Sequence, residues 1–210
     1  MKKGRGFGPV VVAAFLLFLV TAGSAAAAGT GGYVGVFGGY TVPDDLEVSG
    51  GSAGSGDISL EDGYALGLKV GYILPQMPYL AVELEYFYTS NDIDNQAVGA
   101  STVSGDITSN NLFANFFARY PAGWFQPYVG VGIGWSWGET SGSGTGTLAR
   151  ILNQESNDFA WQFLLGADFV VNPQWAIDVG YRYFQCGYGF DSGDGDLTNH
   201  MITAGVKYRF

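Results

Sequence analysis

The sequence LTNHMITAGVKYRF, residues 197–210, alternates between two kinds of side chain. Counting back in twos from Phe210 gives an apolar and aromatic set, and the positions between them are small, polar or cationic. The apolar set is Ile202, Ala204, Val206, Tyr208 and Phe210, and the opposing set is Met201, Thr203, Gly205, Lys207 and Arg209. A period of two is typical of a β-strand whose two faces meet different surroundings. The stretch therefore predicts a strand with one apolar face.

Seven further stretches show the same alternation, and none shows a sustained period of 3.6. The predicted strands cover residues 32–42, 63–74, 79–90, 107–120, 125–138, 158–171, 175–187 and 197–210. Three connections have the length and chemistry of tight turns, namely residues 75–78, 121–124 and 172–174. The other four are long and polar, namely residues 43–62, 91–106, 139–157 and 188–196. Short and long connections that alternate predict short turns at one rim and long loops at the other.

The volumes of the two faces decide which one points inward. The interior of an eight-stranded barrel is just wide enough for side chains to fill it. The apolar set is bulky and would overfill that space, whereas the opposing set is rich in Gly and Ala. A closed barrel also leaves no unpaired strand edge in hydrocarbon. We therefore predict an all-β fold, an eight-stranded antiparallel up-and-down transmembrane β-barrel with aromatic and aliphatic side chains facing lipid.

Aromatic residues gather near both ends of the apolar faces, as expected for rings at the two membrane interfaces. Those near the short turns are Tyr79, Tyr120, Trp124, Phe125, Trp175 and Phe210. Those toward the long loops are Tyr86, Tyr88, Trp135, Trp137, Trp161 and Tyr183. The sequence thus predicts two aromatic girdles.

Nine charged residues fall on the inward face. The cations are Lys69, Arg119, Arg182, Lys207 and Arg209, and the anions are Glu83, Glu85, Asp168 and Asp178. Buried charges are tolerated only when they are paired. We therefore predict a plugged interior cross-linked by salt bridges, with a charge-lined pore as the alternative. The main participants are expected to be Glu83, Glu85, Arg119, Arg182 and Lys207.

Residues 1–28 have the three parts of a secretory signal peptide. Lys2, Lys3 and Arg5 precede an apolar run at residues 9–20, and small residues lead to Ala28. We predict a cleaved signal peptide, residues 1–28, and a barrel domain, residues 29–210; an N-terminal membrane anchor is the alternative. Cleavage leaves six basic residues against nineteen acidic ones, a formal net charge of −13. Such acidity disfavours nucleic acid as a partner.

The signal peptide, the eight alternating strands, the unequal connections and the closing GVKYRF resemble the small outer-membrane barrels of Gram-negative bacteria, of the OmpA/OmpX and opacity-protein type. The resemblance covers essentially the whole mature chain. It implies residence in the outer membrane, contact with membrane lipids and lipopolysaccharide, and recognition of Tyr208 and Phe210 by the barrel-assembly machinery. We expect a monomer without a cofactor.

The long loops, counted together with Asp158 at the start of the sixth predicted strand, carry fifteen acidic residues and one cation, Arg150. We predict a non-enzymatic surface protein that serves envelope integrity or adhesion, with a host or cell-surface ligand at the loops. The alternatives are a narrow porin-like channel and a lipid A-modifying enzyme. Asp191, Asp194 and Asp196 are weak candidates for a Ca²⁺ site, because their Gly-rich loop lacks the full EF-hand pattern.

Two single residues bear on catalysis and redox chemistry. His200 is the sole histidine and falls on the outward face near the long loops. It has no serine beside it, so a catalytic triad would need residues from another strand; the favoured interpretation is an interfacial histidine without a catalytic role. Cys186 is the sole cysteine, which excludes an intrachain disulfide. It is interpreted as a small apolar side chain near a strand end, with a covalent dimer as the alternative.

Overall fold

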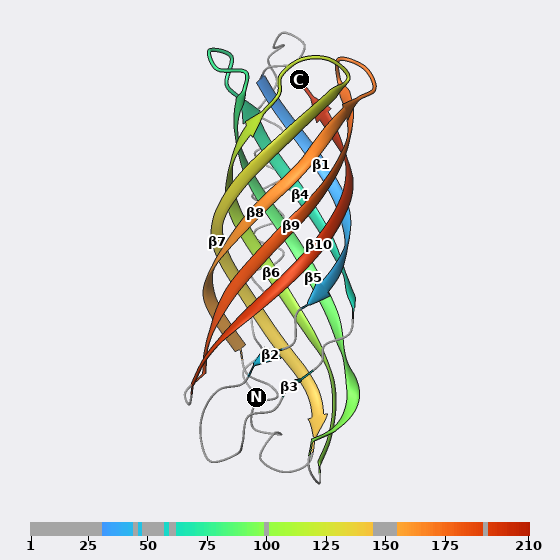
Figure 1. Cartoon of the computed structure of the whole chain (residues 1–210), viewed down its shortest axis with the longest axis vertical. Coiled ribbons are helices and arrows are strands. Elements are labelled where there is room, and N and C mark those ends of the chain that lie inside the picture. Colours follow the sequence, from blue (N-terminus) through green and yellow to red (C-terminus); the bar gives the residue numbers. More distant parts are fainter. Residues whose placement is uncertain are drawn as a thin grey trace.

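A computed structural model of the chain describes residues 31–43, 46–47, 57–58, 62–98, 101–144, 155–190 and 193–210, and the side chains of residues 31–43, 62–91, 108–138, 158–186 and 198–210. The described residues form a closed barrel of antiparallel strands (Figure 1). The barrel strands are β1 (Gly31–Pro43), β4 (Gly63–Ile73), β5 (Leu80–Val98), β6 (Ser101–Arg119), β7 (Phe125–Gly144), β8 (Glu155–Val170), β9 (Trp175–Phe190) and β10 (Gly193–Arg209). The predicted eight-stranded barrel is confirmed. The predicted signal peptide lies outside the described residues.

Each strand pairs with its neighbour in the sequence, and β1 closes the ring by pairing with β10 from Tyr33↔Arg209 to Pro43↔Asn199. Two further strands, β2 (Leu46–Glu47) and β3 (Asp57–Ile58), pair with each other outside the barrel. Within the described ranges, no helix is long and apolar enough to span a membrane.

The short connections are tight turns at one rim, here called the short-turn rim, where the chain also ends (Figure 1). In the first turn the amide of Met77 donates to the carbonyl oxygen of Leu74 at 3.1 Å. In the third, the side-chain oxygen of Asn172 accepts from the amides of Gln174 and Trp175, both at 2.9 Å. Gly123 in the second turn has φ +80°, a left-handed conformation that favours glycine. Hydrogen bonds within the first and third turns, and a glycine in the second, therefore hold the three short connections in tight conformations.

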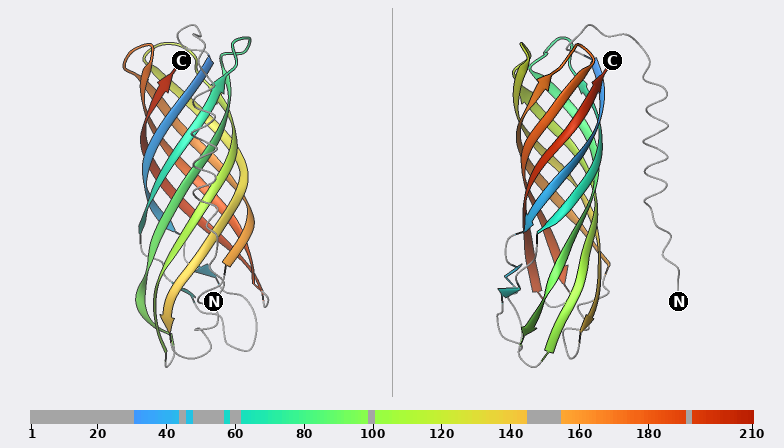
Figure 2. Two further views of the ribbon diagram at one scale, coloured as in Figure 1. Left: turned by 180° about the vertical axis from the view of Figure 1, so that it is seen from behind. Right: turned by 90° about the vertical axis from the view of Figure 1, so that its right-hand side faces the viewer.

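The opposite, long-loop rim differs from the expectation. Strand β5 runs to Val98 and pairs with β6 as far as Val98↔Ser101, and β9 pairs with β10 as far as Phe190↔Gly193. The prediction of long loops at residues 91–106 and 188–196 is therefore wrong for most of these residues. Antiparallel backbone pairing continues beyond the apolar band, where side chains no longer need an apolar face. The strands on this side consequently reach past the ends of β1 and β4 (Figure 2).

Within the barrel wall the side chains sort by alternation. Ile133 and Ile202 are about three-fifths exposed on the outer surface, whereas Lys69 and Glu85 are buried in the lumen. Exposed rings lie toward both ends, among them Tyr79, Tyr120, Trp124 and Trp175 at one end and Tyr64, Trp135 and Trp161 at the other. Trp175 and Tyr183 are eight residues apart on β9, which corresponds to about 20 Å along the barrel axis at a rise of about 3.3 Å and a tilt of about 40°. That height suits the thin outer membrane.

Candidate functional site: the charged and aromatic lumen

The inward side chains of β5 show how the lining of the lumen changes along the barrel axis. They follow one another from the short-turn rim to the long-loop rim as Ala81, Glu83, Glu85, Phe87, Thr89 and Asn91, all of them buried. Carboxylates therefore lie nearer the short turns, an aromatic ring lies between, and neutral polar groups lie nearest the long loops. The other strands extend the same three layers around the barrel.

All nine charged residues predicted to face the lumen are less than a tenth exposed. They come from six strands: Lys69 of β4, Glu83 and Glu85 of β5, Arg119 of β6, Asp168 of β8, Asp178 and Arg182 of β9, and Lys207 and Arg209 of β10. Each occupies an inward position because the strand alternation places it there. The structure brings these residues together in two groups.

Asp168 is the hub of the first group. Its Oδ1 lies 2.8 Å from Lys207 Nζ, and its Oδ2 lies 2.9 Å from Arg209 Nη2. Arg119 Nη2 is 4.0 Å from the same Oδ2. Three cations from two strands thus surround one carboxylate, so this residue carries much of the charge compensation near the short-turn rim.

Two tyrosines extend this group toward the middle of the lumen. Asp178 pairs with Lys69, lies 3.4 Å from Lys207 Nζ, and accepts a hydrogen bond of 2.7 Å from the Tyr128 hydroxyl. The Tyr33 hydroxyl donates to Glu83 at 2.7 Å. Lys207 Nζ also lies 4.9 Å from the centre of the Tyr128 ring, within cation–π range.

Glu83 accepts a second hydrogen bond, of 3.1 Å, from Asn115 Nδ2. Asn115 Oδ1 in turn accepts from Gln162 Nε2 at 2.8 Å. Tyr33, Tyr128, Asn115 and Gln162 were not predicted as site residues. The signal in the sequence was their parity: Asn115 and Gln162 alternate in step with charged residues of their strands, and Tyr33 and Tyr128 alternate in step with glycines.

Arg182 and Glu85 form the second group. Both terminal nitrogens of the guanidinium donate to the carboxylate, one of them to Oε2 at 2.9 Å, and Nη1 also donates to Gln162 Oε1 at 3.1 Å. Strands β5 and β9 are four places apart in the ring of eight, so this bidentate pair crosses the lumen. The guanidinium stacks on Phe87, with 4.7 Å from Cζ to the ring centre.

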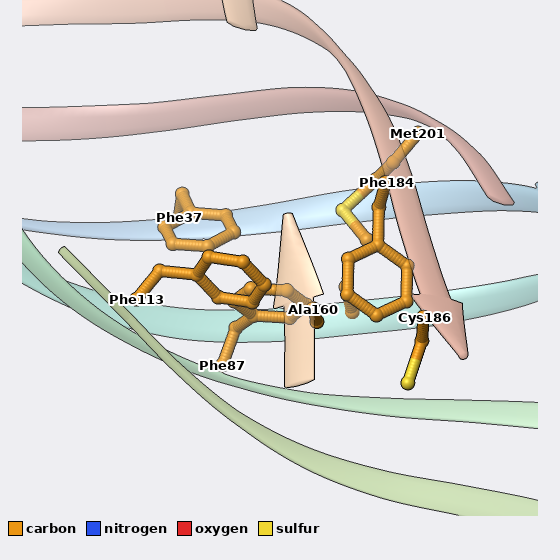
Figure 3. Packing of buried hydrophobic residues seen from close by; sticks show 8 residues of the cluster. Phe37, Phe87, Phe113, Ala160, Phe184, Cys186 and Met201 are labelled. Carbon is orange, nitrogen blue, oxygen red and sulfur yellow. The ribbon is translucent and has the colours of Figure 1, made fainter. Parts of the chain in front are cut away.

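The next layer is an aromatic plug made of Phe37, Phe87, Phe113 and Phe184 (Figure 3). Ring centres are 5.7 Å apart for Phe87 and Phe113 and 5.8 Å apart for Phe113 and Phe184. Ala65, Ala160, Cys186 and Met201 complete the cluster. The expectation that aromatic side chains face lipid is wrong for these four phenyl rings. The signal that could have found them was parity, since Phe87, Phe113 and Phe184 alternate in step with Glu85, Asn111 and Arg182, and Phe37 alternates in step with Gly35 and Gly39.

Glycine explains how a narrow lumen holds such rings. A Cβ atom on Gly67 would lie 2.3 Å from the Phe37 ring, and one on Gly134 would lie 2.7 Å from the Phe113 ring. The small residues expected on the inward face are therefore present, and the absence of a side chain on these glycines leaves room for the rings of neighbouring residues. This packing fills the lumen at the level of the aromatic plug.

Beyond the plug, short polar side chains pair with one another. The Thr41 hydroxyl donates to Asn91 Oδ1 at 2.6 Å, and the Thr89 and Ser109 hydroxyls are 2.6 Å apart. Asn111 Nδ2 donates to Ser109 Oγ at 3.0 Å. These short polar groups line part of the lumen on the long-loop side of the plug.

The remaining predicted residues lie elsewhere. Tyr208 and Phe210 are on the outer surface at the short-turn rim, where the Tyr208 ring packs on Trp175 at 5.0 Å and the Phe210 amide donates to the Gly32 carbonyl oxygen at 2.9 Å. His200 Nδ1 is hydrogen-bonded to the Tyr181 hydroxyl on the outer surface. Cys186 is buried beside the aromatic plug.

The side chains of Asp191, Asp194 and Asp196, the weak Ca²⁺ candidates, lie outside the described side chains. Among the residues whose placement is described, no group of three or more His, Cys, Asp or Glu is arranged to hold a metal ion.

Comparisons with known proteins agree with this architecture. The family model described as "Outer membrane protein beta-barrel domain" matches residues 12–210. The crystal structure of Neisserial surface protein A is 19% identical with a TM-score of 0.58, covering 86% of this chain and 98% of the other. OprG from Pseudomonas aeruginosa is 18% identical with a TM-score of 0.54, covering 88% and 98%. A comparison with curated proteins gave no match. The chain therefore belongs to the outer membrane protein beta-barrel domain family and resides in the outer membrane.

Proposed function

We propose that residues 29–210, after removal of residues 1–28, form a sealed and non-enzymatic surface barrel that serves envelope integrity or adhesion through its long-loop rim. In outer-membrane barrels short turns face the periplasm and longer connections face the cell exterior. The long-loop rim is thus the side that a host or cell-surface ligand meets. The aromatic plug is the observation that carries the proposal.

The plug supports a sealed barrel because rings from β1, β5, β6 and β9 meet inside one narrow ring of strands. An eight-stranded barrel has room for side chains and little else. The Arg182–Glu85 pair crosses the lumen directly beneath the plug and is held in place by both oxygens of the carboxylate. A continuous water path would have to displace both layers.

Conductance in planar bilayers tests the sealed lumen. Wild-type protein is expected to give no regular current steps, and Phe87→Ala combined with Phe113→Ala is expected to give them, because two neighbouring rings of the plug are removed. Leu66→Ala combined with Val131→Ala is the matched control, since both side chains are exposed on the outer surface. Regular steps from the wild-type protein would favour the narrow channel instead.

Ligand binding at the long-loop rim requires a separate experiment. Replacing residues 44–61 by a short Gly/Ser linker is expected to reduce attachment of expressing cells to host matrix or host cells. Replacing the turn residues 75–78 with another tight turn is the control, because it alters only the periplasmic rim. Equal attachment by both variants and the wild type would argue against adhesion through this segment.

Lipid A mass spectra of expressing cells test the absence of enzymatic activity. We expect the acyl pattern to match that of cells with an empty vector. A changed pattern that disappears with His200→Ala would instead support a lipid-modifying enzyme. The mass of the mature N-terminus, measured on the same membranes, tests cleavage after Ala28.

A further inference from the structure

The short-turn end of the lumen holds more positive than negative charge. Arg182 and Glu85 neutralise each other. The other buried charges in the described part of the chain are Lys69, Arg119, Lys207 and Arg209 against Glu83, Asp168 and Asp178. Asp158, the next acid on the inward face of β8, is ten residues from Asp168, or about 33 Å along the strand. Among these buried side chains, the positive charges thus exceed the negative charges by one.

Arg119 and Arg209 compete for the same two acceptors. Gln126 Oε1 accepts from Nη2 of both arginines, at 3.1 Å in the case of Arg209. Asp168 Oδ2 is 2.9 Å from Arg209 but 4.0 Å from Arg119. Arg119 Nη1 is buried without a hydrogen-bonding partner among the residues described. A buried donor in that state costs about 1–3 kcal/mol, and more when it is charged.

A cavity of about 20 Å³ lies beside this guanidinium. Arg119 and Lys207 line it with positive charge, Asp168 contributes one carboxylate, and Tyr33, Phe117 and Tyr128 supply aromatic walls. A single water-sized species needs about 10–15 Å³ of such volume. The cavity therefore has room for one small species beside the guanidinium.

We propose that this cavity binds one small monovalent anion of the size of chloride, with Arg119 Nη1 as the donor and Lys207 as the second positive charge. A water molecule would satisfy the donor but would leave the charge excess buried. An anion satisfies both, because one negative charge balances the one uncompensated positive charge. The site opens on the periplasmic half of the barrel and is separate from the long-loop rim.

Thermal unfolding of the refolded full-length barrel in detergent tests the site, with chloride exchanged for gluconate at constant ionic strength. Chloride is expected to raise the unfolding midpoint of the wild type by about 2–4 °C, the shift that corresponds to about 1 kcal/mol in a domain of this size. Arg119→Gln should lose this shift. Ser109→Ala, a lumen change beyond the aromatic plug, should keep it.

Three results would overturn the site: an equal shift with sulfate, no shift in the wild type, or a full shift in Arg119→Gln. Crystals of the wild type grown in bromide provide the second measurement, which decides the matter even if the variant fails to fold. An anomalous peak within contact distance of Arg119 Nη1 supports the assignment. Absence of a peak there refutes it.

Discussion

The charged half of the lumen, near the short turns, and the aromatic plug beyond it fill the same narrow barrel by different means. Around Asp168 and Asp178, four cations are held by directed contacts such as the 2.8 Å from Lys207 Nζ to Asp168 Oδ1. In the plug, phenyl rings pack against one another and against glycines, and the Arg182 guanidinium lies over two of the rings. Charged contacts depend on every partner being present, whereas packed rings depend on shape. Substitutions in the two halves should therefore reduce the stability of the barrel in different ways.

The largest effect is expected from Asp168→Ala, which removes the hub and leaves Lys207, Arg209 and Arg119 without their shared carboxylate. Breaking buried ion pairs in this manner costs about 3–5 kcal/mol. Urea unfolding in detergent, followed by the heat-dependent shift in gel mobility, measures the loss. Asp62→Asn is the control, because Asp62 is exposed and its loss should cost no more than about 0.5 kcal/mol. Equal losses would mean that the hub contributes no special stability.

Phe113→Ala should cost about 3–4 kcal/mol, because it removes a ring that contacts Phe87 and Phe184 and leaves a cavity. Phe113→Leu should recover most of that loss, since shape rather than charge is what the plug requires. The same unfolding measurement applies. If the leucine variant were as unstable as the alanine variant, the plug would depend on ring-specific contacts instead.

A smaller loss, about 1–3 kcal/mol, is expected from Gly67→Ala, whose methyl group would collide with the Phe37 ring. Gly38→Ala is a matched control on the neighbouring strand, because the nearest atom to its added methyl group is 3.7 Å away, an ordinary contact. Thermal midpoints of the two variants, compared side by side, measure the difference. Similar midpoints would show that Phe37 moves aside without cost.

The smallest effect is expected from His200→Ala, which lies outside both halves of the lumen. It removes the contact with the Tyr181 hydroxyl at the exposed surface and should cost less than about 1 kcal/mol. Urea unfolding of His200→Ala beside Tyr181→Phe measures both ends of this contact. If His200→Ala lost as much stability as Asp168→Ala, contacts on the outer surface would contribute far more to stability than expected.

The sequence predicted the barrel because alternation directly records which residues face lipid. It placed Lys69, Glu85 and Arg182 on the inward face for the same reason. It did not predict that Arg182 pairs with Glu85, since partners across the lumen depend on register and stagger, which a single strand does not encode. Phe87 and Phe113 were not named for either face, although their parity with Glu85 and Asn111 placed them inside.

Strand ends were also poorly predicted at the long-loop rim. Apolar alternation stops where the membrane stops, but β5 and β6 remain paired as far as Val98 and Ser101. Backbone hydrogen bonds carry those segments, and any side chain in an extended conformation is compatible with them. The polarity of residues 91–98 and 101–106 was therefore compatible with strand structure.

The pairing of β1 with β10 joins the two strands of the barrel that lie farthest apart in the sequence. Tyr33 and Arg209 are partners although 176 positions separate them in the sequence. Until β10 is in place, β1 and β9 each keep an open row of unpaired amides and carbonyls, which hydrocarbon does not tolerate. Completion of the ring therefore requires β10 to pair with both β9 and β1. Such distant pairing makes assembly slow compared with proteins built from local contacts.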